Sequence, residues 1–203
     1  MRRTGHPEQA AGESLAARIL RMGILTAILI LPDQITKIAA KGALEGKGPA
    51  VLIPGILELR YVENRGAAFG MLQNRQWLFV LLAAVISAAC IRAVAGLPRG
   101  EGRALKAAAL FLAAGALGNM IDRVARGFVI DFIYVSAIHF PVFNLADMYV
   151  VISTAVLLIL LVFVYPEDEL WRLAGKNTGN GPENAGEEEN GKDEKGPDPR
   201  GGR

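Results

Sequence analysis

The sequence predicts an all-α integral membrane protein, in which four transmembrane helices carry a small extracytoplasmic β-platform between the first and second helix. Three observations favour this fold class. Of the 203 residues, 52% are hydrophobic although 21% are charged, and the mean hydropathy is positive at +0.31. Four apolar stretches are long enough to cross a bilayer. Most charged residues lie outside those stretches, as is typical of a membrane protein with polar ends.

The four stretches reach the length that a membrane-spanning helix needs. About 20 residues at a helical rise of about 1.5 Å cross the roughly 30 Å hydrocarbon layer. We expect helices at Leu15 to Ala40, Gln76 to Gly96, Ala104 to Arg123 and Asn144 to Tyr165. The first stretch is not a cleaved signal peptide, because it is too long for one and no small-residue cleavage pattern follows it.

Composition divides the chain into three parts. We expect a cytoplasmic N-terminal extension at residues 1–14, a membrane domain at residues 15–165 and a cytoplasmic tail at residues 166–203. The tail carries ten acidic and six basic residues and few apolar ones. Such a segment buries too little apolar area to offset the entropy of ordering, so we predict that it is largely disordered. Docking of a partner protein is the alternative role.

Basic residues indicate the orientation in the membrane. They are diluted in the long connection of residues 41–75 and crowd the short flanks on the other side of the predicted spans. The crowded positions are Arg2, Arg3, Arg18, Arg21, Arg92, Arg99, Arg103, Lys106, Arg172 and Lys176. The positive-inside rule therefore predicts that both termini are cytoplasmic.

Two connections lie on the opposite, outer side. In residues 41–75, Pro49, Pro54 and Gly55 interrupt any helix, and residues 56–62 then partly alternate apolar and polar side chains. This pattern predicts one or more short strands that form the platform. The second outer connection, Val124 to Phe143, is apolar enough to be expected as a loop on or in the membrane interface.

Polar side chains within the spans gather at one depth. A charged side chain near the bilayer midplane costs about 2.5–3.5 kcal/mol on insertion scales, so each one needs a reason. The predicted topology places near the outer surface both the polar residues of the spans and Asp131 of the outer loop; those of the spans are Asp33, Lys37, Asn119, Asp122, Arg123, Asn144 and Asp147. Spacing by three or four residues also puts Asp33 with Lys37, and Asn119 with Asp122 and Arg123, on shared helix faces.

The charged pairs differ in the chemistry that they favour. Asp33 with Lys37, and Asp122 with Arg123, favour structural or substrate-positioning ion pairs. Asp131 and Asp147 have no adjacent cation in the sequence. If they face each other, one carboxyl keeps a proton while the other is ionised, as an aspartic peptidase requires. A proton- or ion-coupled transporter would use the same carboxylates, so chemistry alone leaves both functions open.

Other classes of site have little support. A single cysteine, Cys90, excludes an intramolecular disulfide and is expected to be a packing residue. Two histidines leave little for zinc, and the scattered basic residues do not indicate nucleic-acid binding. We expect His139 to be a solvated loop residue. A serine–lysine dyad of Ser136 with Lys37 is a further, weaker alternative.

Five sequence blocks, taken in order, resemble the bacterial lipoprotein signal peptidase family (signal peptidase II). They read DQITK at 33–37, NRGAAFG at 64–70, GALGNMIDR at 115–123, GFVIDF at 127–132 and FNLAD at 143–147. The resemblance covers about Leu15 to Tyr165. One departure is Ala114, where the family commonly has the first glycine of a Gly-Gly pair. It affects no residue that the family uses in catalysis.

This resemblance implies an intramembrane aspartic endopeptidase of the bacterial cytoplasmic membrane. Such an enzyme removes signal peptides from diacylglyceryl-modified prolipoproteins and cuts before the lipidated cysteine. The resemblance implies that Asp131 and Asp147 are the catalytic dyad, close to the extracytoplasmic surface. Its expected partners are the prolipoprotein substrates, membrane lipid and globomycin-type inhibitors. No metal and no other cofactor is expected.

The resemblance also implies a set of substrate-binding or supporting residues. These are Asp33, Lys37, Asn64, Gly66, Ala68, Asn119, Asp122, Arg123, Asn144 and Ala146. A small proton-coupled transporter remains the alternative function. It would need a polar route to both membrane surfaces, whereas the inner halves of the predicted spans are apolar. The sequence therefore favours the peptidase.

Overall fold

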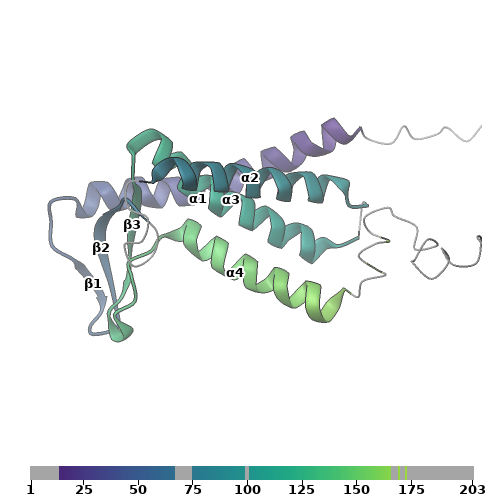
Figure 1. The fold of residues 1–203 in the computed structure, drawn as a ribbon. Helices are drawn as coiled ribbons and strands as arrows, with labels where there is room; N and C mark the ends of the chain where they lie inside the picture. Colours follow the sequence, from purple (N-terminus) through teal and green to yellow (C-terminus); the bar gives the residue numbers. More distant parts are fainter. Residues whose placement is uncertain (1–13, 67–74, 99–100, 166–168, 170–171, 173–203) are drawn as a thin grey trace, which may run out of the picture.

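The computed structural model describes residues 14–66, 75–98, 101–165, 169 and 172 (Figure 1). The predicted site residue Ala68, nearly all of the predicted N-terminal extension and most of the predicted tail lie outside these described residues.

In the part of the chain that the structure describes, four helices are long and apolar enough to cross a membrane, which confirms the predicted spans. They are α1 (Leu15–Leu44), α2 (Gln76–Gly96), α3 (Arg103–Arg126) and α4 (Leu145–Ile159). The π-helical segment η3 (Leu160–Val164) continues α4, and the two together form the fourth span. Ser14 begins α1, because its hydroxyl oxygen accepts a hydrogen bond from the Ala17 N–H at 3.2 Å. In Figure 1, α1 and α3 run toward the sheet, and α2 and α4 run away from it.

Helix α3 lies among the other three helices and contacts each of them. Its buried side is built mainly from small residues, among them Ala109, Ala113, Ala114, Gly115 and Gly118. Small side chains let helix backbones approach closely, which is how helices associate in a bilayer. Large apolar side chains on the other helices face outward and are available to lipid, as at Leu20, Ile28, Val85, Val151 and Phe163.

A three-stranded antiparallel sheet lies at one end of the helices (Figure 1). Its strands, in spatial order, are β1 (Ala50–Ile53), β2 (Leu57–Asn64) and β3 (Val129–Val135). The first two confirm the strands expected in residues 41–75. The third corrects the sequence prediction, because it comes from the connection between α3 and α4 that was expected to be an interfacial loop.

Strand β3 escaped the sequence analysis because it lacks the alternation of a half-buried strand. It is the last strand of the sheet: β2 pairs along one of its edges, and the backbone of Phe143 bonds to Phe132 and Ile133 along the other. Residues Val129 to Phe132 are consecutively buried. A strand covered on both faces reads as a continuous apolar run, which periodicity cannot separate from an interfacial loop. After β3, the short 3₁₀ helix η2 (Ser136–Ile138) leads toward α4.

We predict that a methyl group at Gly115 destabilises the fold by about 1–3 kcal/mol, the usual cost of overpacking. A Cβ atom there would lie 2.5 Å from the Ala146 carbonyl oxygen and 2.8 Å from Val150 Cγ2. Gly23→Ala is the matched control, because nothing lies within 4 Å of a Cβ at that helical position. In detergent micelles, the free energy of unfolding should be lowered by Gly115→Ala and unchanged by Gly23→Ala. Equal stability of the two variants would show that the α3–α4 contact is looser than described.

Candidate active site

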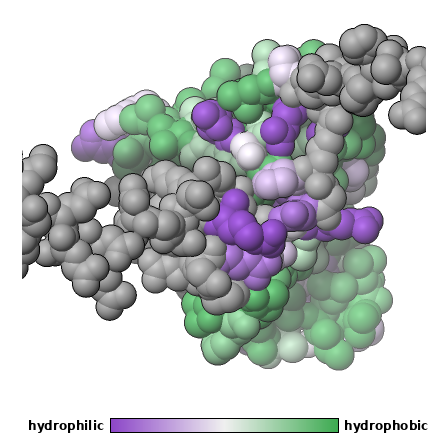
Figure 2. Space-filling model, turned by 90° about the vertical axis from the view of Figure 1, so that its right-hand side faces the viewer, coloured by the Kyte–Doolittle hydropathy of each residue, from purple (hydrophilic) through white to green (hydrophobic). Residues whose placement is uncertain are grey.

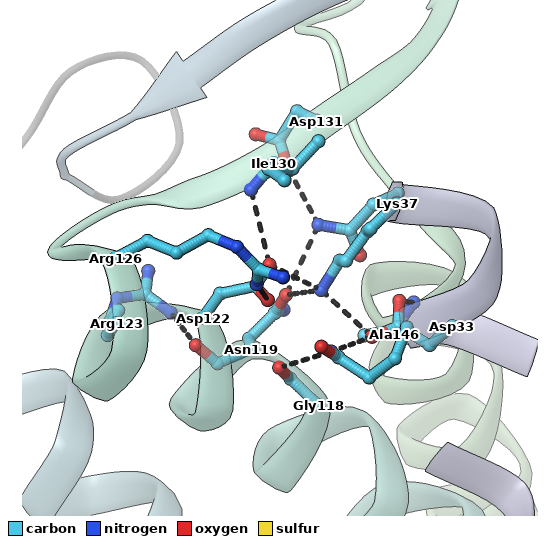
Figure 3. A network of polar contacts seen from close by, with 12 residues as sticks. Asp33, Lys37, Gly118, Asn119, Asp122, Arg123, Arg126, Ile130, Asp131 and Ala146 are labelled. Carbon is cyan, nitrogen blue, oxygen red and sulfur yellow. Dashed lines mark hydrogen bonds and ion pairs between the residues drawn. The ribbon is translucent and has the colours of Figure 1, made fainter. Parts of the chain in front are cut away.

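The centre of the site is Lys37, whose side chain is completely buried on α1. Its Nζ atom lies 2.9 Å from Asp33 Oδ2 and 3.1 Å from Asp122 Oδ2, and it donates to Asn119 Oδ1 at 2.9 Å (Figure 3). Three acceptors match the three donors of an ammonium group. The ion pair of Asp33 with Lys37 is therefore formed as the spacing predicts, and it extends to α3.

Asp122 has a different partner from the one predicted. Its carboxylate pairs with Lys37 and with Arg126, and Oδ2 also accepts the Ile130 N–H at 3.2 Å. Arg123 was expected as its partner, but neighbouring helix residues point about 100° apart, whereas residues four apart share a face. The Arg123 guanidinium instead donates to the Gly66 and Asn119 carbonyl oxygens at 3.2 and 3.3 Å.

Two asparagine side chains connect Lys37 to the two remaining aspartates. The oxygen of Asn119 accepts from Lys37, and its Nδ2 donates to Asp147 Oδ1 at 2.7 Å. Asn144 Nδ2 donates to Asp131 Oδ1 at 2.6 Å and to Asn119 Oδ1 at 3.2 Å. Because Lys37 holds the oxygen of Asn119, the amide nitrogen of Asn119 must point at Asp147.

The start of α4 holds Asp147 in place. Asn144 is the N-cap residue: its Oδ1 accepts the Asp147 N–H at 3.0 Å, and Asp147 Oδ2 accepts the Asn144 N–H at 3.1 Å. This reciprocal capping box satisfies two free donors of the helix. The positive end of the helix dipole also favours a carboxylate in the first turn. Asp147 is therefore fixed through both of its oxygens.

Asp131 approaches the same point from β3, with only 2% of its surface exposed. Its Oδ2 accepts a hydrogen bond from Asn64 Nδ2 at 2.9 Å, and its Oδ1 accepts from Asn144. Burial, together with the nearby charge of Asp147, raises the pKa of Asp131 to about 7. The hydrogen bonds from the two asparagines and the charge of Lys37 oppose that rise. Its surroundings thus favour the protonated form of Asp131 more than water does.

The other predicted residues position these elements. Asp33 Oδ1 accepts the Ala146 N–H at 2.9 Å and so ties the first turn of α4 to α1. Ala146 is fully buried, and its Cβ would lie 3.3 Å from a Cβ atom built at Gly118. A residue larger than alanine at position 146 would therefore separate α4 from α3. Asn64 Oδ1 accepts the Gly66 N–H at 3.0 Å, which turns the chain as it leaves β2.

All predicted site residues except Ala68 are described, and they gather in this one region. Sequence reasoning missed Arg126, although its position four residues after Asp122 was a usable signal. It also missed Gln34, which donates to Asp33 Oδ2 at 3.0 Å and to the Gly118 carbonyl at 3.1 Å. The bond that the alternative dyad of Ser136 with Lys37 would need is not formed, because the buried Ser136 hydroxyl bonds to no described residue.

The geometry suits acid–base chemistry by two carboxyls. Asp131 and Asp147 both form a hydrogen bond with Asn144, and both interact electrostatically with Lys37. Two carboxyls that interact can share one proton, and an arrangement of this kind can supply one general base and one general acid. Within residues 14–66, 75–98 and 101–165, no three His, Cys, Asp or Glu side chains are grouped to hold a metal ion.

Comparison with known proteins gives a consistent set of similarities. A family model described as signal peptidase (SPase) II matches residues 25–163. A lipoprotein signal peptidase of Symbiobacterium thermophilum is 40% identical over 151 residues, which cover 70% of this chain and 93% of that protein. Proteins of the same name from Clostridioides difficile and Brevibacillus brevis are each 38% identical, and cover 69% and 67% of this chain and 93% and 91% of their own length.

Two solved structures, each described as a bacterial membrane enzyme, are similar in fold. Both are 29% identical in sequence, with TM-scores of 0.60 and 0.61. They cover 70% and 72% of this chain, and the chain covers 87% and 95% of theirs.

We predict that Lys37→Met destabilises the protein by about 3–5 kcal/mol, because it leaves the buried Asp33 carboxylate without a cation and Asp122 with Arg126 alone. Lys41→Met is the matched control one helical turn away. Lys41 lies 3.7 Å from Glu45 with 42% of its side chain exposed, so its loss should cost at most about 1 kcal/mol. Thermal unfolding in detergent measures both. Parental stability of Lys37→Met would mean that the buried pair is dispensable.

Proposed function

Because the chain belongs to the signal peptidase II family, we propose that it is an intramembrane aspartic endopeptidase that processes lipidated prolipoproteins. The family identifies it as a protease of a bacterial membrane, with four helices able to cross the bilayer. We further propose that it cuts before a cysteine carrying diacylglycerol. The observation that supports this most is the pair of Asp131 and Asp147, brought together from β3 and α4 at Asn144.

The proposed reaction uses one proton shared between Asp131 and Asp147. The ionised carboxylate takes a proton from a water molecule, whose oxygen attacks the carbonyl carbon of the scissile peptide. The protonated carboxyl gives its proton to the carbonyl oxygen, which forms a tetrahedral diol. As the C–N bond breaks, a carboxyl protonates the leaving amine and a diol hydroxyl returns its proton to the other carboxylate. The dyad then holds one proton again.

Three asparagine side chains hold this pair in position: Asn64, Asn119 and Asn144. Each donates an N–H to a carboxylate oxygen, which fixes the orientation of both carboxyl groups. The Nε atom of Arg123 is buried and has no partner among the described residues. We propose that it donates to a carbonyl oxygen of the bound peptide, as the bond of Arg123 to the Gly66 carbonyl already holds its guanidinium near β2.

Lipid recognition is proposed for an apolar groove between α3 and α4. The groove has a volume of about 440 Å³ and begins at Leu145 and Met148, beside Asp147. It continues along α4 past Ile152 to Val156, with alanines of α3 on its other wall. Acyl chains contribute about 0.8 kcal/mol for each buried methylene. A substrate anchored in the outer leaflet would reach the groove by lateral diffusion, and its lipid would position a short peptide at the dyad.

The proposed orientation has both termini in the cytoplasm and the dyad near the extracytoplasmic surface. It rests on the positive-inside rule applied to the flanks of the spans. The transporter alternative loses its support once the chain belongs to a peptidase family. Globomycin-type inhibitors are proposed to bind at the dyad, as the resemblance implies.

We predict that Asp131→Asn and Asp147→Asn each lower kcat/KM for a diacylglyceryl-modified prolipoprotein by at least about 100-fold, the usual contribution of a general acid or base. Each variant keeps the shape of the side chain and loses its titrating proton. Glu45→Gln, at the exposed end of α1, removes a carboxylate outside the site and should cleave at the parental rate. Purified proteins should be compared by cleavage and by retention of lipidated substrate. Near-parental cleavage by either Asn variant would remove that aspartate from the dyad.

We predict that the cleavage rate falls as the pH rises above about 7, because Asp131 then loses the proton that the dyad needs. Asn64 stabilises the ionised form of Asp131, so Asn64→Ala raises the Asp131 pKa. The decline of the cleavage rate at alkaline pH (the alkaline limb of the pH profile) then begins at a higher pH. The shift should be about one to two pH units, since a hydrogen bond to a charged group contributes about 1.5–3 kcal/mol.

The control for this pH profile is Glu63→Gln. Glu63 precedes Asn64 and pairs with Arg65 at 2.9 Å, so its replacement should leave the limb in place. A limb that stays fixed in Asn64→Ala, or moves to lower pH, would contradict the assignment of the proton to Asp131.

A further inference from the structure

A second polar site lies at the end of the helices opposite the sheet. Arg18 and Arg21 of α1 and Lys106 of α3 line a cavity of about 120 Å³, whose inner wall includes Met22, Val94 and Leu97. Figure 2 looks at this end of the molecule and shows hydrophilic side chains gathered between apolar surfaces. We propose that the cavity binds the phosphate head group of an anionic phospholipid in the adjacent leaflet. This site is independent of the proposed peptidase activity.

The cations are held in place by the end of α2. Arg18 donates to the Leu97 carbonyl oxygen, and Lys106 Nζ donates to the Pro98 carbonyl oxygen at 2.5 Å. Helix α2 has no basic residue in its last turn, so its terminal carbonyls are satisfied from the two neighbouring helices. A guanidinium has five donors and an ammonium three, so these bonds leave donors on both side chains for a ligand.

The local field favours an anion. No acidic side chain lines the cavity among the described residues. Nearby Glu101 is paired with Arg172 at 3.4 Å. The cavity also lies beside the start of α3, whose N-cap residue Gly102 provides no side-chain cap and whose first turn has no acidic residue. The unsatisfied N–H groups of a helix start add to the attraction for a phosphate group.

A lipid suits this cavity better than a free anion because the site is amphipathic. Ile19 and Leu20 lie between Arg18 and Arg21 in sequence and expose 36% and 65% of their surface. They offer apolar contact for acyl chains directly beside the cations. The positive-inside rule places this end in the cytoplasm, where the leaflet is rich in anionic lipid. Basic pockets between transmembrane helices on that side bind such head groups.

The test compares lipids with identical acyl chains on the full-length protein in neutral detergent. Native mass spectrometry should show phosphatidylglycerol bound at least about tenfold more tightly than phosphatidylcholine, in line with the attraction expected for several basic residues. Arg21→Gln and Lys106→Gln should each weaken phosphatidylglycerol binding about fivefold. Arg103→Gln removes a charge at the same end without lining the cavity, so it should weaken binding less than twofold.

Each other outcome overturns the proposal. Equal binding of the two lipids, or an equal effect of Arg103→Gln, would mean that only the general surface potential acts. Inorganic phosphate that displaces phosphatidylglycerol and stabilises the protein equally well would indicate a site for free anions. Thermal unfolding in phosphatidylcholine checks that the variants are folded. Should Lys106→Gln fail that check, unchanged binding by Arg21→Gln is sufficient to reject the site.

Discussion

The buried ammonium of Lys37 is the interaction on which the rest of the structure depends. It joins Asp33 of its own helix to Asp122 and Asn119 of α3, and none of the three charged side chains reaches solvent. A buried charge that loses its partner costs several kcal/mol, so these groups stabilise the fold only as a complete set. Through Asp33, which accepts the Ala146 N–H, the set also fixes the start of α4. Three helices therefore meet at one cation.

The same cluster determines where Asp131 and Asp147, the two carboxyls of the proposed dyad, lie. Asp122 accepts the N–H of Ile130, the residue before Asp131, so β3 is bound to the cluster through its backbone. Asn119 bridges Lys37 and Asp147 by hydrogen bonds, and Asn144 bridges Asp147 and Asp131 in the same way. A strand and a helix start thus reach a common point without a direct covalent constraint. The groups that support the site are the same groups that assemble the helices.

Sequence reasoning predicted what depends on local pattern and missed what depends on tertiary contact. Length and hydropathy were enough to predict the four spans, and helical spacing was enough to pair Asp33 with Lys37. Strand β3 was missed because burial on both faces removes the alternation that marks a strand. The partner of Asp122 was assigned to its neighbour Arg123, although helix geometry favours Arg126. Asn144 is recognisable as an N-cap from sequence, but its bond to Asp131 is not.

The bilayer explains why polar groups carry so much of this architecture. Between helices in lipid, burial of apolar area provides no net driving force, because acyl chains are as apolar as the side chains that they replace. Association then depends on close backbone contact and on interhelical hydrogen bonds. Gly115 and Gly118 supply the first at the α3–α4 contact, and Asp33, Asn119 and Asn144 supply the second. A polar cluster at one end of the bundle therefore performs the assembly that an apolar core performs in water. Such a cluster is also a pre-organised environment for carboxyl chemistry, so stability and the proposed activity rest on one set of residues.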